Sequence, residues 1–171
     1  MKAHFRRSIL ASLILALASL VMVYAQQPKK DNTAHDQMNK RGDHVMGFDH
    51  TRTTHHFLLQ ESGGSIEVTA NNSDDVESRE QIRMHLKHIA KMFAEGNFNA
   101  PMLIHDQTPP GVPVMQELRG EIKYNYEEID RGAAVRISTK NETALNAIYD
   151  FLRFQIKEHK TGDSLDIIKR N

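Results

Sequence analysis

The chain has 171 residues, with 22 basic and 22 acidic side chains and no cysteine. The lack of cysteine excludes disulfide bonds, a thiol nucleophile and lipid attachment through a thiol. Because the charges balance, the chain has no basic surplus with which to neutralise phosphates, and we expect no nucleic-acid partner.

The N-terminus has the pattern of a signal peptide. Three basic residues precede an apolar run from Ile9 to Val23, which is short for a membrane span. A small-residue motif ends at Ala25 and predicts that residues 1–25 are removed. An uncleaved N-terminal anchor is the alternative. We therefore expect a periplasmic or secreted protein with no stable membrane span after cleavage.

Residues 26–171 are about one domain in size and carry a formal charge of −3, because three of the 22 basic residues lie in the signal peptide. Residues 26–53 are predicted to be a flexible leader and a His-rich loop, with at most one helical turn near Asp36–Lys40. Residues 54–162 are predicted to form one domain, and residues 163–171 a loose C-terminal tail.

Two hairpins are predicted from alternating apolar residues. Strand Thr54–Gln60 is expected to pair with Ser65–Ala70, and strand Ile122–Glu128 with Ala133–Thr139. Each hairpin precedes an amphipathic helix, at about residues 76–95 and 141–160. The buried stripes of these helices are Ile82, Leu86, Ile89 and Phe93, and then Leu145, Ile148, Tyr149, Leu152 and Ile156.

The segment between the two units has weaker signals. Residues 101–105 are predicted to be a brief strand or a buried connector, and residues 108–113 a non-helical loop rich in proline. The two β-β-α units match in pattern at an offset of about 69 residues in the strands and nearer 63 in the helices. Duplication and coincidence both explain this match.

The predicted fold class is α+β. We expect an antiparallel sheet of about four strands, built from two β-β-α units, with two helices on one face. No nucleophile elbow or phosphate-binding glycine loop is present in the sequence, so no catalytic residues are predicted.

Histidine and methionine are the residues that suggest a function. Nine histidines and six methionines follow the signal peptide. Imidazole binds zinc and copper, and thioether selects soft copper(I) or serves as an axial haem ligand. The candidate cofactors are therefore copper, zinc or haem, and the candidate metal ligands are His44, Met46, His50, His55, His85, His88, Met92 and His105.

Spacing makes the candidate site more specific. On a helix, His85, His88 and Met92 form a ridge at the edge of the buried stripe, where the alternative is that they pad the core boundary or face solvent. On the first strand, His55 should point inward with Phe57, and His56 outward. We predict that residues 44–56 fold against the ridge and form one site.

Several segments resemble those of small secreted bacterial proteins of an uncharacterised family. They are Met46–His50, Thr54–Phe57, Gly64–Asn71 and Ile104–Met115. The resemblance implies an exported bacterial protein and supplies no catalytic residues.

Two classes of function follow. The first is an exported binding protein for a transition metal or haem. The second is a structural or partner-binding module without a cofactor, in which Phe154 is exposed and, with Phe151, forms a homodimer contact.

Overall fold

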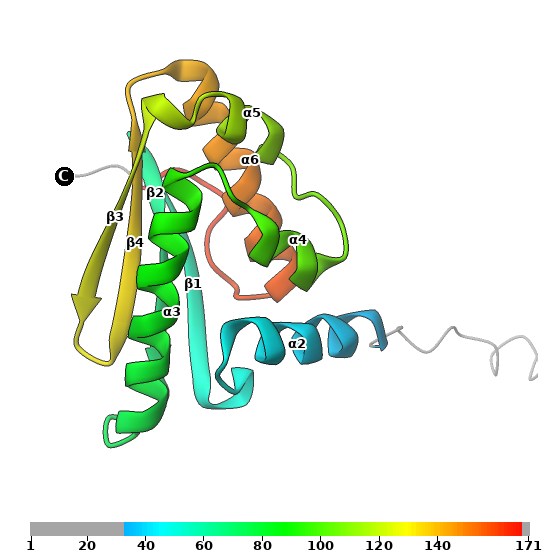
Figure 1. Ribbon diagram of the computed structural model, residues 1–171, viewed down its shortest axis with the longest axis vertical. Helices are drawn as coiled ribbons and strands as arrows, with labels where there is room; N and C mark the ends of the chain where they lie inside the picture. The colour runs from blue at the N-terminus through cyan, green and yellow to red at the C-terminus, as the bar shows by residue number, and fades with distance from the viewer. Residues whose placement is uncertain (1–32, 169–171) are drawn as a thin grey trace, which may run out of the picture. The chain divides into compact units, whose positions relative to one another are not determined.

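The computed structural model describes residues 33–168, so the predicted signal peptide and residues 26–32 lie outside the described part. Four strands form one antiparallel sheet in the order β1-β2-β4-β3 (Figure 1). Their bounds are Thr53–Gln60 for β1, Gly63–Ala70 for β2, Ile122–Ile129 for β3 and Gly132–Thr139 for β4. The predicted α+β class and both predicted hairpin pairings are confirmed.

Two long helices cover one face of this sheet. Helix α3 (Val76–Ala94) begins at Asp75, whose side chain accepts a hydrogen bond from the Ser78 amide. Helix α6 (Glu142–His159) begins in the same way at Asn141, which accepts from the Ala144 amide. Asp and Asn are favoured at this position because they satisfy an amide that has no partner inside the helix. The predicted stripes are buried, except that Leu145 is partly exposed.

The two β-β-α units have the same geometry. Thr53 corresponds to Ile122 and Ala70 to Thr139, so both hairpins are in the same register at an offset of 69 residues. In the centre of the sheet, Ile66 pairs with Val135, its own equivalent in the second unit. An approximate two-fold axis therefore passes between β2 and β4. The helices match at an offset of 66, from Asp75 to Asn141, and not at 63 as predicted.

Each long helix lies over strands of the other unit. Helix α3 packs chiefly on β3 and β4, whereas α6 packs most closely on β1. Gly64 of β2 permits this approach, because a Cβ there would lie 2.4 Å from Leu152 Cδ1 of α6 and 2.2 Å from the Leu58 carbonyl oxygen. Closely packed helices and strands of this kind tolerate no extra atom without strain.

The connecting segments contain more helix than the sequence predicts. The leader contains helix α2 (Thr33–Met46), which buries Met38 and Met46 and donates a hydrogen bond from Arg41 Nε to the Ile104 carbonyl. Residues 101–105 belong to helix α4 (Asn99–His105), so the strand alternative is wrong and the buried-connector alternative holds. The predicted non-helical loop holds for residues 108–111, and α5 (Val112–Glu117) begins at its last two residues. Short 3-10 turns, η1 (His50–Arg52) and η2 (Arg119–Glu121), lead into β1 and β3.

The C-terminal segment is also more ordered than predicted. Its Asp163 side chain accepts hydrogen bonds from the Phe57 amide and from His56, and the Ile168 amide donates to the Leu59 carbonyl. Residues 161–168 therefore lie along the outer edge of β1. Among the described residues, no helix has the length and apolar character needed to cross a membrane.

Candidate binding pocket

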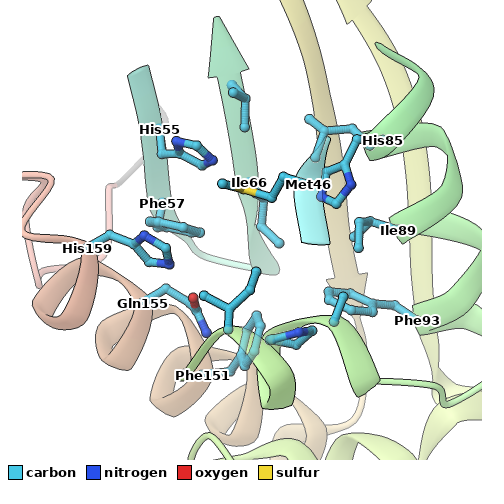
Figure 2. Close-up of a pocket in the computed structure, with 15 residues that line it drawn as sticks. Met46, His55, Phe57, Ile66, His85, Ile89, Phe93, Phe151, Gln155 and His159 are labelled. Carbon is cyan, nitrogen blue, oxygen red and sulfur yellow. The ribbon is translucent and has the colours of Figure 1, made fainter. Parts of the chain in front are cut away.

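A pocket of about 60 Å³ lies between the sheet, α3 and α6, and is closed at its sides by residues of α2 and α4 (Figure 2). Most of its wall is apolar. The apolar wall comes from Phe57, Ile66, Val68, Leu86, Ile89, Phe93, Ala100, Pro101, Ile104 and Phe151. The remaining lining residues are Met46, His55, His85, Gln155 and His159. We call this the inner pocket.

A second, more polar hollow adjoins it. This outer pocket has a volume of about 230 Å³ and shares Met46, His55 and His159 with the inner pocket. Its other lining residues are His35, Met38, Asn39, Gly42, His50, Thr53, Thr54 and Thr161. Helix α2 supplies His35, Met38, Asn39, Gly42 and Met46 of this lining, so the helix missing from the sequence prediction builds a large part of the outer pocket.

The inner pocket gathers side chains from distant parts of the chain. His55 comes from β1 and points inward beside Phe57, as the alternation of the strand predicts, while His56 points outward to Asp163. His85 comes from α3 and His159 from the last turn of α6. Aromatic packing holds the rings in place: Phe48 stacks on His55 at 5.9 Å and meets His85 edge-on at 5.6 Å.

The three pocket histidines are partly buried, and desolvation favours their uncharged form. Desolvation lowers the pKa of His55 to about 4, with further lowering by the neighbouring His85, His56 and His50. Desolvation, followed by repulsion from His88, lowers the pKa of His85 to about 4. The pKa of His159 is also well below its ordinary value, first because of burial and then because of His55, His105 and His35. At neutral pH each ring therefore keeps a lone pair on one nitrogen.

The predicted metal ligands are only partly brought together. Met46, His55 and His85 line the inner pocket, which is the predicted contact between residues 44–56 and the α3 ridge. His44 and His88 are exposed, and Met92 packs against the core. His105 is buried behind the wall, where its Nε2 lies 3.0 Å from Gln155 Oε1.

His50 belongs to a different cluster. Within residues 33–168, Asp43, Asp49 and His50 form the one group of three His, Asp or Glu side chains with ligand atoms within 4.8 Å of one another. His50 Nδ1 already pairs with Asp43 at 2.9 Å, and Asp49 Oδ1 accepts from the Thr51 amide and hydroxyl. The hydrogen bonds of Asp43 and Asp49 stabilise the start of the η1 turn, so the cluster is explained without a metal ion.

Sequence reasoning missed His159 and Gln155. Gln155 and His159 follow Leu152 by three and seven residues, a spacing that predicts the sheet-facing side of α6; Gln155 is buried and His159 is partly buried. At the 66-residue offset, Gln155 corresponds to Ile89 and His159 to Phe93. Polar residues at positions that are apolar in the first unit were the available signal.

Comparisons with known proteins identify no relative. No family model matches the chain, and no curated protein or solved structure is significantly similar to it. The likeness to secreted bacterial proteins therefore stays a prediction, and the function has to be argued from the pocket.

Proposed function

We propose that this chain is an exported binding protein for a soft transition-metal ion, copper(I) above all, held in the inner pocket by His55, His85 and Met46. The observation that carries the proposal is that two uncharged imidazoles and a thioether line one desolvated pocket. Figure 2 shows the Met46 side chain between the two rings. Nitrogen and thioether donors together favour copper(I) over the hard cations that prefer oxygen.

The proton chemistry favours a metal as well. A metal takes the lone pair of a neutral imidazole, and protonated ligands have to lose a proton before they bind. Because burial already keeps His55 and His85 uncharged, binding at neutral pH releases no proton from either ring. His159 stacks on His55 with ring centroids 5.7 Å apart, which makes it the nearest further imidazole donor.

The geometry favours a single ion over haem. Ligand pockets for molecules of drug size measure about 300–1,000 Å³. The inner pocket, at about 60 Å³, has no room for a porphyrin in this conformation. An ion needs only that the ligand side chains converge by small rotations, and methionine, with three rotatable bonds, adapts easily.

The partner-binding alternative was based on a homodimer contact through Phe151 and Phe154, and the structure weakens that basis. Phe151, predicted to contact another chain, is 1% exposed and packs inside the core. Phe154 is partly buried and lies against the His105 ring at 4.9 Å. Phe151 therefore offers no surface for a homodimer contact, and Phe154 offers only part of its ring.

The test is copper(I) binding measured by competition with the chromophoric chelator bicinchoninate under ascorbate. We expect the parent protein to withdraw one copper(I) and to melt at a higher temperature when loaded. A His55→Gln/His85→Gln double variant should lose roughly 100-fold or more in affinity, since even outer-sphere changes cost about 10–100-fold. His88→Gln, which changes an exposed histidine on the same helix, is the matched control. An equal loss in both variants, or no copper withdrawn by the parent, refutes the proposal.

A further inference from the structure

One polar side chain in the inner pocket has no role in the metal proposal. Gln155 lies on the sheet-facing side of α6, is 3% exposed and lines the pocket. Its equivalent in the first unit is the apolar Ile89, so the fold itself does not require an amide at this position. Buried polar groups that packing does not require are normally paired or serve a ligand.

The orientation of the Gln155 amide follows from His105. Gln155 Oε1 lies 3.0 Å from His105 Nε2, and a carbonyl oxygen can only accept, so the ring nitrogen donates. This bond commits the oxygen of the amide. The Gln155 Nε2 group is buried and, within residues 33–168, has no acceptor. It carries two N–H donors, and the pocket that Gln155 lines is walled mainly by aromatic and aliphatic side chains.

The remaining ring nitrogen of His105 does not satisfy that donor. His105 Nδ1 is buried and likewise has no partner among the described residues. The two groups therefore do not pair with each other, although their side chains are already joined by one hydrogen bond. No described residue completes Gln155, and the pocket that this side chain lines is the space in which a ligand could supply an acceptor.

We propose that the inner pocket binds a small uncharged molecule with one accepting oxygen, which takes a hydrogen bond from Gln155 Nε2 while its apolar part packs on Phe151, Phe93 and Ile104. An ionic organic ligand does not fit this wall, because no described residue that lines the pocket carries a formal charge at neutral pH to pair with it. A metal ion differs, because imidazole and thioether lone pairs coordinate it directly. The size is limited too: a cavity of about 150 Å³ takes benzene, so about 60 Å³ suits only a few non-hydrogen atoms.

This subsite is separate from the proposed metal ligands. Gln155 and Phe151 stand on the α6 wall, whereas His85 stands on α3 across the pocket (Figure 2). The inference uses neither His55, His85 nor Met46. It can fail while copper binding holds, and copper binding can fail while it holds.

Acetone and isobutene are matched probes, since they have the same shape and differ in the accepting oxygen. Each is titrated into the ¹⁵N-labelled full chain and followed by NMR, with Gln155→Met as the variant that keeps the side-chain length and loses the donor. We expect the ratio of the isobutene Kd to the acetone Kd to fall about tenfold in the variant, the value of one neutral hydrogen bond. Acetone, and not isobutene, should also shift the Gln155 side-chain N–H₂ signals of the parent protein.

Two results overturn the proposal. One is a ratio that is the same in the parent and in Gln155→Met. The other is a Gln155 N–H₂ signal that does not move at any acetone concentration at which the protein stays folded and soluble. That result indicates that water alone satisfies the amide. The second measurement uses the unaltered chain, so it decides the question even if the variant folds poorly.

Discussion

Burial sets the charge of the pocket histidines. His55 and His85 reach a pKa of about 4 chiefly through desolvation, and neighbouring histidines lower it further because each would repel a second positive ring. No carboxylate is among the causes that shift the pKa of either residue. A partly buried histidine without a counter-charge resists protonation, so the lowered pKa values favour uncharged rings at neutral pH.

This burial makes stability depend on pH. The ordinary histidine pKa is 6.5, so between pH 6.5 and about 4 the unfolded chain binds protons that folded His55 and His85 do not. Stability is therefore complete above pH 6.5 and falls as the pH is lowered through this window. The slope is at most about 1.4 kcal/mol per pH unit for each such histidine. Urea unfolding from pH 7.5 to 4.5 measures it.

Variants assign the slope to particular residues. His55→Gln should flatten the decline in unfolding free energy between pH 6.5 and 4.5, because a non-titrating side chain then occupies the buried position. His88→Gln should change the slope less than His55→Gln does, since repulsion from His88 is only the second cause, after desolvation, of the lowered pKa of His85. Equal slopes in the parent and in His55→Gln would contradict the predicted uncharged state of His55.

At the scale of elements, the two edge strands of the sheet differ in how they are protected from pairing with another chain. Strand β3 presents the exposed side chains Lys123, Asn125 and Glu127 along its length, and such charged edges discourage pairing with another chain. Strand β1 is instead covered by residues 161–168. Burial alone would raise the pKa of Asp163, but hydrogen bonds from Thr161, the Phe57 amide and His56 outweigh it and hold that pKa below its ordinary value.

Asp163→Ala tests this cover. The change removes the acceptor for the Phe57 amide and for His56, which lie 2.9 Å and 2.8 Å from its oxygens. A hydrogen bond to a charged group has a net contribution of about 1.5–3 kcal/mol, and the bond from the half-exposed His56 contributes less, so we expect a loss of about 2 kcal/mol in unfolding free energy. Asp166→Ala, at an exposed position in the same segment, should cost less than about 0.5 kcal/mol. Comparable losses in both variants would show that Asp163 does not hold the segment.

The strands and long helices were predictable because their patterns are strong. Period-two alternation identified all four strands, and the stripe from Ile82 to Phe93 identified the face of α3 that is buried. Helix α2 was missed because it is polar on most of its surface and buries few apolar side chains, among them Met38 and Met46. Short apolar runs such as residues 101–105 do not distinguish a strand from a buried helix.

The pocket was predictable only in part. Local periodicity placed His55 on the inner face of β1 and His85 beside the buried stripe of α3, and both line the pocket. It could not pair them with His159 and Gln155, because contacts between α6 and β1 span about a hundred residues of sequence and depend on how the helices cross the sheet. Composition also weighted His44 and His88 equally with the others, although both are exposed.

At the scale of the molecule, the crossing of the helices ties the two β-β-α units together. The apolar faces of β3 and β4 are covered by α3 from the first unit, and that of β1 by α6 from the second. The inner pocket lies in the seam, with His85 from one unit and His159 from the other. A site built in this way exists only when both units are folded against each other.

Separating the units should therefore unfold both. The exposed residues Asp106 and Gln107 between α4 and α5 offer a point of division, giving fragments 33–106 and 107–171. Each fragment keeps a hairpin whose apolar face has lost its main covering helix, and isolated hairpins are at best marginally stable. We expect neither fragment to show cooperative thermal unfolding by circular dichroism at low micromolar concentration. An equimolar mixture should recover a cooperative transition, because α3 can then cover β3 and β4 of the other fragment and α6 can cover β1. If fragment 33–106 melts cooperatively alone with dispersed amide signals, then the first unit folds independently and the crossed packing is not what stabilises it.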